Sequence, residues 1–407
     1  MSSPTIRPFP YPYKAMLAIC SDLDETPDSD RYFEIARFLN TTEETAAGTG
    51  VGLEVGNTIY FDMPDDQFAY WNTDDVGREK VRKLIRSGHI DTFHSFGDLA
   101  TTREHAQRAL NELQEHGCRI ECWVDHAVAP TNVGADIMQG RGDICGDPAY
   151  HADLSYEHGV RFVWRGRVTS VIGQDRRRQV PGLVSLRNPV ATARTTAIEI
   201  AKGVLGRRGN SKFEMHGTNN LARETQLRDG RTVLEFMRCN PHWGGLSTGD
   251  TGDGLADVLT DKFLKRLVKR RASSILYTHL GKTRFPDTLF NPATAAALRQ
   301  LADARNRGDV LVTTTRRMLV FWLLKQYLTV SISGQQSTES VHINTGALRK
   351  LEMPCELDGL TIYVRNSQTA RLFVDGEEIR GLQRNTADDR GQQSVSIPWR
   401  PLEFPAI

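Results

Sequence analysis

The feature that most constrains this chain is an apolar run that ends abruptly in two carboxylates. Residues 15–26 read AMLAICSDLDET, so the run stops at Asp22 and Asp24. A short apolar run bounded by charge is typical of a buried strand, and in parallel α/β folds ligands and catalytic groups collect where such strands end. Because Asp22 and Asp24 are two residues apart, they project to the same side of an ideal strand. Paired carboxylates bind a metal or divide the roles of acid and base, and a solvated acidic turn is the simpler alternative.

Polar residues follow further apolar runs along the chain. Strand-like segments end at His94, at Asp125 and His126, and at His279, and segments with a helical period separate them. Repeated strand and helix units favour a parallel sheet, most simply one that closes into a barrel. Since parallel strands end at the same edge of a sheet, we expect these side chains to gather around one site.

Three segments depart from this rhythm. Residues 47–72 are rich in glycine and then alternate, which predicts a hairpin insertion beside the mouth of the site. Residues 168–230 predict a long irregular insertion. From residue 329 onward the helical period is lost and alternating runs are joined by glycine-containing turns. The sequence therefore predicts an α/β barrel over residues 1–328 and a small all-β domain over residues 329–407.

Composition bounds the possible partners. The net charge of the 407 residues is +1, so no overall field recruits nucleic acid or an anionic membrane. No apolar run approaches the roughly 18–20 residues of a membrane helix, and the proline-rich N-terminal segment does not resemble a secretory signal. The six cysteines form no CxxC pair, which is typical of reduced thiols. We therefore expect a cytoplasmic protein that binds neither nucleic acid nor membrane.

Taken in order, the motifs over about residues 10–328 resemble those of the polysaccharide deacetylase superfamily, the NodB-homology carbohydrate esterases. Asp22-Leu23-Asp24 is similar to that family's Asp-x-Asp motif. The stretch from His94 to Asp98 is similar to its His-(Ser/Thr)-x-x-His motif, with Asp98 in the place of the second histidine. The run LYTH that ends at His279 is similar to the last motif, whereas the Arg-x-Pro motif is absent.

This resemblance implies a distorted (β/α)7-type barrel that removes acyl groups from amino sugars with one divalent metal. It implies Asp22 as the general base, His279 as the general acid, and metal ligation by Asp24, His94 and Asp98. An extra carboxylate makes a harder ligand set, so manganese, iron and cobalt join zinc as candidate metals. His126 or His89 would replace Asp98 if that residue does not bind.

Four further residues are candidates for substrate binding. Asp125 and His126 are expected to line the site because they follow a strand. Arg165 could take the place of the missing family arginine. Trp243, in the stretch NPHWGG, either stacks on a sugar ring or lies in a simple turn.

Two other functions fit part of the pattern. ICSDLDET is also similar to the first motif of haloacid-dehalogenase-type phosphatases, in which Asp22 would be the nucleophile, Asp24 the acid/base and magnesium the metal. That alternative gives the strand-end histidines no role. A non-catalytic glycan-binding barrel is the third possibility. The expected partner is an acylated sugar or glycan, and a homo-oligomer stays an open alternative.

Overall fold

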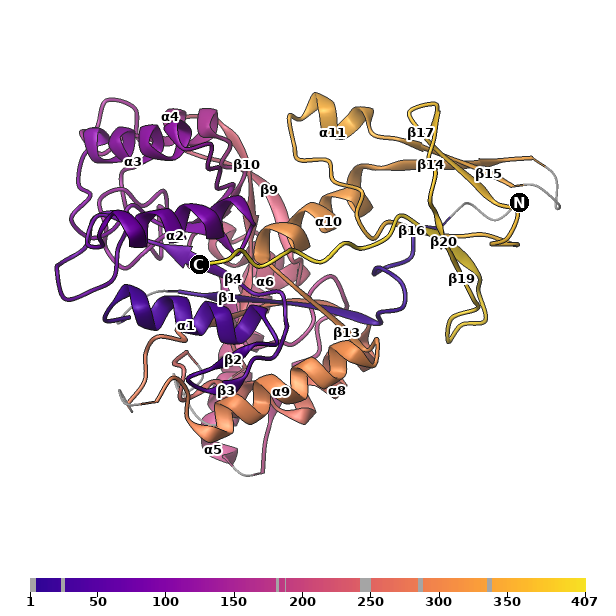
Figure 1. The fold of residues 1–407 in the computed structure, drawn as a ribbon, viewed down its shortest axis with the longest axis horizontal. Coiled ribbons are helices and arrows are strands. Elements are labelled where there is room, and N and C mark those ends of the chain that lie inside the picture. The colour runs from indigo at the N-terminus through magenta and orange to yellow at the C-terminus, as the bar shows by residue number, and fades with distance from the viewer. Residues whose placement is uncertain are drawn as a thin grey trace.

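The computed structural model describes residues 5–22, 26–180, 183–186, 188–241, 250–284, 288–334 and 339–407. It has a mixed α/β fold whose main part is a large, curled, half-barrel sheet of mostly parallel strands with helices around it (Figure 1). The C-terminal strands lie at the opposite end of the long axis of the molecule. The parallel sheet expected from the strand and helix rhythm is confirmed at this level.

The large sheet is built around its first strand. The strand order is β8-β11-β12-β1-β4-β5-β6-β7-β10-β9, and β13 pairs with the first half of β1. The strands are β1 (Ala15–Ser21), β4 (Gly56–Ile59), β5 (Ile90–His94), β6 (Cys122–Val124), β7 (Phe162–Trp164), β8 (Val168–Thr169), β9 (Ala222–Gln226), β10 (Thr232–Phe236), β11 (Arg238–Cys239), β12 (Ser273–Thr278) and β13 (Val310–Thr313). All residues of β1 are buried, and its end lies between β12 and β4. Only the pair formed by β9 and β10 is antiparallel among the named strand pairs of this sheet.

Helices connect these strands. They are α1 (Ser29–Asn40), α2 (Asp75–Arg86), α3 (Arg103–Glu115), α4 (Ala152–His158), α5 (Pro189–Arg207), α6 (Glu214–Thr218), α7 (Leu255–Val258), α8 (Asp261–Arg270), α9 (Pro292–Asn306) and α10 (Thr315–Tyr327). Several begin after a residue whose side chain accepts a hydrogen bond from a free backbone N–H of the first turn, namely Asp28, Asp74, Thr260, Asn291 and Thr314. Such caps stabilise a helix start by about 1 kcal/mol and fix where each connection leaves the sheet.

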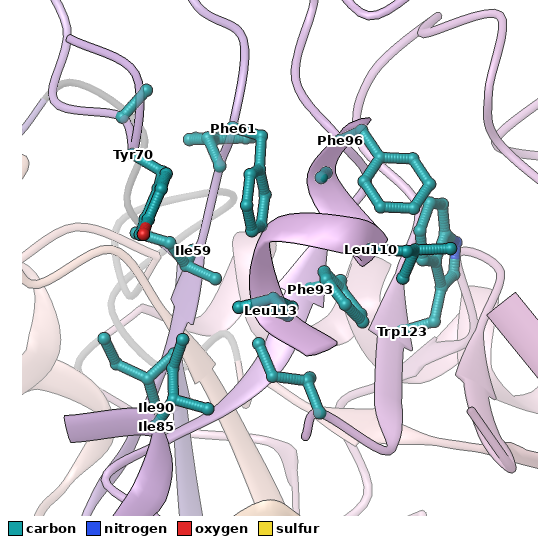
Figure 2. Packing of buried hydrophobic residues seen from close by; sticks show 14 of the residues in the cluster. Ile59, Phe61, Tyr70, Ile85, Ile90, Phe93, Phe96, Leu110, Leu113 and Trp123 are labelled. Atoms are coloured by element: carbon teal, nitrogen blue, oxygen red, sulfur yellow. The ribbon is translucent and has the colours of Figure 1, made fainter. Parts of the chain in front are cut away.

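An aromatic core supports the strand ends of β5 and β6. Phe93 and Phe96 have ring centroids 5.4 Å apart, and Phe96 lies 5.0 Å from Trp123. Phe61 and Leu110 belong to the same buried cluster (Figure 2). Burial of each such side chain contributes roughly 1.5–3 kcal/mol, so the strand ends next to this cluster are held rigidly.

The C-terminal strands form two small sheets. One has the order β14 (Thr329–Ser333), β15 (Ser340–Asn344), β17 (Arg371–Val374) and β18 (Glu377–Glu378), and the other has β16 (Thr361–Tyr363), β20 (Ser394–Ser396) and β19 (Gln383–Asn385). They share the core residues Val341, Ile362, Leu372 and Val395. A short helix, α11 (Gly346–Lys350), interrupts the expected all-β character.

Both ends of the described chain cross between the two parts. Ile6 pairs with Ile362 of β16, although it precedes β1. At the other end, the backbone N–H of Leu402 donates to the Glu54 carboxylate at 2.9 Å, and Phe404 packs against His89 with ring centroids 5.1 Å apart. The predicted boundary at residue 328 therefore separates two sheets that exchange segments.

The hairpin insertion predicted over residues 47–72 is wrong. A minimal hairpin of β2 (Glu44–Thr45) and β3 (Gly48–Thr49) overlaps only the start of this range, and β4 is an inner strand that runs parallel to both β1 and β5. The sequence of β4, GNTI, does not alternate between apolar and polar residues, and the polar residues Asn57 and Thr58 are buried along with the others. A strand that is buried on both faces gives no two-residue period to recognise.

The irregular insertion predicted over residues 168–230 is also wrong, because it contains the 19-residue helix α5. The apolar side chains of α5 face solvent and its Thr, Glu and Gly residues face the protein. The usual inward stripe of apolar residues is therefore missing from the sequence.

His89 makes the stability of this fold sensitive to acid. Burial, with a smaller effect from Arg317, lowers the pKa of His89 from 6.5 to about 4. Below pH 6.5 His89 becomes protonated in the unfolded chain, whereas in the folded chain it stays neutral until the pH falls to about 4. The stability that neutral His89 contributes is fully present above pH 6.5. As the pH falls from 6.5 to about 4, up to roughly 3 kcal/mol of the free energy of unfolding is lost. Urea denaturation at both ends of the window should show a smaller pH dependence for His89→Gln than for the unaltered chain, and an equal dependence would contradict the prediction.

Candidate functional site

A buried ion pair lies where β1 ends. The Arg238 guanidinium donates from Nη1 and Nη2 to the two carboxylate oxygens of Asp22, at 2.6 and 2.7 Å. Both side chains are almost completely buried. Burial acts to raise the pKa of the Asp22 carboxyl, but Arg238, His94 and His279 outweigh it and hold the pKa below its usual value. Asp22 is therefore an ionised carboxylate at neutral pH.

Aromatic rings enclose the cation of this pair. The guanidinium carbon of Arg238 lies 4.3 Å from the ring centroid of Trp164 and 4.9 Å from that of Tyr277. Cation–π contacts with desolvated rings are worth up to about 2 kcal/mol each and also fix the plane of the guanidinium. Because Nη1 and Nη2 of Arg238 both donate to Asp22, the orientation of the Asp22 carboxylate is fixed as well.

His94 reaches the same carboxylate from the end of β5. Its Nε2 lies 3.5 Å from Oδ2 of Asp22, and the imidazole stacks on Tyr60 with ring centroids 4.6 Å apart. His126, from the loop after β6, presents its ring 4.6 Å from that of His94. Side chains from three strand ends thus converge, as the sequence predicts.

Asp98 contacts His126. Its carboxylate lies 2.9 Å from Nδ1 of His126, and it is partly exposed whereas His126 is mostly buried. The cap of α3 is Thr102, so Asp98 does not begin that helix. The chain turns between His94 and Asp98 through Gly97 at a φ of 107°, where a Cβ would lie only 2.1 Å from the backbone oxygen of Asp62. This tight turn is what brings Asp98 back beside the strand ends.

Asp125 is fully buried and holds its own loop. Its Oδ1 accepts hydrogen bonds from the indole N–H of Trp123 at 2.8 Å and from the backbone N–H of Val133 at 2.9 Å. Burial nevertheless raises the pKa of Asp125 to about 7. The contacts of Asp125 place it in a supporting position rather than on a surface that a substrate could reach.

His279 lies just beyond the end of β12. Its Nδ1 is 2.5 Å from the carbonyl oxygen of Asp250, and its Nε2 is 3.3 Å from the hydroxyl of Tyr277. Because a carbonyl only accepts, Nδ1 must be the protonated nitrogen of the neutral ring, which leaves Nε2 as the nitrogen that can gain or lose a proton. His279 is close enough to Asp22 to help lower the pKa of that carboxyl.

Arg165 is a candidate to replace the missing family arginine, but the structure pairs it with a different carboxylate. Arg165 contacts Glu235 at 3.2 Å, and Arg167 and Arg223 contact the same carboxylate. Glu235 is fully buried, and a buried carboxylate requires such cationic partners. The arginine on Asp22 is Arg238 instead. It stands directly after the apolar run TVLEFM, so the strand-end rule that singled out Asp22 could also have found it.

The donors for a metal are only partly described. Asp24 and Trp243 lie outside the described residues. Among the residues that the structure does describe, no group of three or more His, Cys, Asp or Glu side chains is arranged to hold a metal ion. His94 lies 3.5 Å from Asp22, His126 lies against His94, and Asp98 contacts His126.

The chain matches no family model, no curated relative and no solved structure. Function therefore has to follow from the chemistry of Asp22, Arg238, His94 and His279.

Proposed function

We propose that this protein is a metal-dependent hydrolase that removes an acyl group, held as an amide or ester, from a sugar or sugar-like substrate. The observation that carries the proposal is the meeting of Asp22, His94 and His279 at the ends of β1, β5 and β12. These are the three residues to which the deacetylase resemblance assigns a base, a metal ligand and an acid. A cytoplasmic location belongs to the same proposal, supported by cysteines that are all free thiols.

The finer fold that we propose is a distorted seven-stranded barrel. Only Met237 separates β10 from β11, and these two segments pair with β7 and β12 respectively. Taken as one interrupted strand, β10 and β11 would join the two ends of the sheet. The strands β1, β4, β5, β6, β7, β10–β11 and β12 would then follow one another in chain order, as in other α/β barrels.

The hydrolysis assigns a different task to each charged side chain. Asp22 remains ionised and accepts a proton from the attacking water, since each carboxylate oxygen keeps a second lone pair beside its bond to Arg238. Arg238 acts through Asp22 by holding it in orientation. His279, with Nδ1–H fixed on the Asp250 carbonyl, acts as the general acid in its imidazolium form, whose Nε2 proton goes to the leaving nitrogen or oxygen.

The donor chemistry fits a divalent metal, although the ligand set is incomplete within the described residues. His94 and Asp98, together with Asp24, would hold it, and two carboxylates with one imidazole suit zinc, manganese, iron or cobalt. Such an ion supplies polarisation of the acyl carbonyl and a lower pKa of the bound water.

The proposal is tested by product analysis and metal content. We expect acetate release from a panel of N- and O-acetyl sugars, a tightly held transition metal in the purified protein, and loss of both in His94→Ala. His342→Ala is the matched control, because His342 lies on β15 in the C-terminal sheet and should change neither measurement. Full activity and metal content in His94→Ala would refute the proposed site. Phosphate release from phosphate esters with readily lost magnesium would instead support the phosphatase alternative.

A further inference from the structure

Helix α5 presents its apolar side chains to solvent. Its buried residues are Thr192, Thr195, Glu199, Gly203 and Gly206. On the opposite arc, Val190 is 83% exposed and Ile200 is 50% exposed. This is the reverse of the usual surface helix, whose apolar stripe faces the core.

The inward face of α5 is fixed by specific contacts. Glu199 accepts a hydrogen bond from the hydroxyl of Thr169 at 2.9 Å and forms ion pairs with Arg178 and Lys202. At Gly206 a Cβ would lie 2.0 Å from the backbone oxygen of Phe213, so the helix cannot turn another residue type inward there. The outward position of the apolar residues therefore follows from how α5 packs.

The exposed apolar residues of the described chain are concentrated in this one region. Seven of the twelve large apolar side chains that are exposed lie between residues 184 and 205. We call this set the α5 face, and it consists of Val184, Leu186, Val190, Ile198, Ile200, Val204 and Leu205. Helix α5 itself lies at the lower edge of the molecule in Figure 1. Soluble monomers rarely expose large contiguous apolar patches, and those that occur often mark interaction sites.

The exposed charges of α5 itself are basic. Arg194, Arg207 and Arg208 are exposed on or next to the helix, whereas its one acidic residue, Glu199, faces inward. A two-fold dimer would bring this patch against its own copy, and therefore arginine against arginine. An anionic bilayer matches both properties, because aliphatic side chains enter the boundary between headgroups and acyl chains while arginines bind lipid phosphates.

We propose that the α5 face is a peripheral docking surface for an anionic membrane. The contact lies in the plane of the bilayer, and among the described helices none is long and apolar enough to cross it. The net charge of +1 led to the opposite expectation, because a sum over the whole chain does not report a local basic surface. The proposal is independent of the hydrolase assignment, since no residue of the α5 face belongs to the candidate site.

Vesicle sedimentation with the full chain tests this surface. We expect the protein to bind vesicles of phosphatidylcholine containing about a third phosphatidylserine, to bind far less to phosphatidylcholine alone, and to dissociate as salt is raised. The pair Ile200→Glu and Val204→Glu should abolish binding. The pair Arg207→Gln and Arg208→Gln should weaken it by roughly fivefold for each arginine removed.

The matched control is Val76→Glu, which places a carboxylate on a valine that is 65% exposed at the start of α2. It should bind vesicles as the unaltered protein does, and thermal melting of each variant confirms that it is folded. Equal binding to both vesicle types, or binding that survives the Ile200 and Val204 changes, would overturn the proposal. So would light scattering that shows a dimer which these two changes dissociate, because the α5 face would then belong to a second copy.

Discussion

Replacing Arg238 with methionine is expected to lower the free energy of unfolding by about 3–5 kcal/mol and to abolish turnover. The guanidinium is fully buried and is bound to both oxygens of Asp22, so its removal leaves a carboxylate buried without a counterion. Urea denaturation at neutral pH measures the first effect, and product release measures the second.

A double replacement separates the structural role of this pair from its chemical role. Asp22→Leu combined with Arg238→Met removes both charges, and the free energy of unfolding should return most of the way to that of the unaltered chain. Turnover should stay absent. Arg371→Met is the matched control, because its ion pair with Glu378 is exposed and should contribute little. Equal effects of Arg238→Met and Arg371→Met would contradict the importance of burial.

Asp22→Asn is expected to lower kcat/KM by about 10²–10⁴-fold, since the amide keeps the size of the carboxyl but cannot accept the proton of water. KM should change much less than kcat, because Asp22 acts on the water rather than on the substrate. Steady-state kinetics on the substrate found by the acetyl-sugar panel gives both constants. An unchanged kcat would remove Asp22 from the reaction.

The pH profile supplies a second measurement at the same carboxylate. Arg238 and the neighbouring histidines hold the pKa of Asp22 below 3.8, so the unaltered base stays ionised until the pH falls below the ordinary carboxyl range. Arg238→Lys keeps a charge but loses the two parallel hydrogen bonds. The opposing effect of burial then gains weight, and the acid limb of kcat/KM should move to higher pH. A limb that does not move would show that Arg238 acts on stability alone.

Sequence reasoning located the strand ends because they combine two strong local signals. β1, β5 and β12 are short strand-like segments that end at or just before Asp22, His94 and His279, and the parallel sheet brings these ends together. The bounds of α2 could also be predicted, since its apolar period is regular and Gly88 follows it at a φ of 82°. Where the apolar period and the residue at the turn indicate the same end, the bounds of an element can be predicted from the sequence.

The features that escaped prediction depend on contacts between distant segments. Arg238 stands at a strand end that the sequence indicates, but its pairing with Asp22 spans 216 positions of the chain and no local pattern reports it. β4 is buried on both faces although it contains polar residues. The contacts of Glu199 hold the polar face of α5 against the protein and leave its apolar face exposed. In each case tertiary packing overrides the pattern that a single segment shows.

The exchange of segments between the two parts has a consequence for synthesis. Glu54 and His89 leave the ribosome more than 300 residues before Leu402 and Phe404, which are their partners. Until Leu402 and Phe404 emerge, the nascent α/β part lacks the backbone N–H that donates to Glu54 and the ring that packs against His89. A ribosome stalled near residue 400 would therefore display an α/β part in which Glu54 and His89 still lack these two contacts.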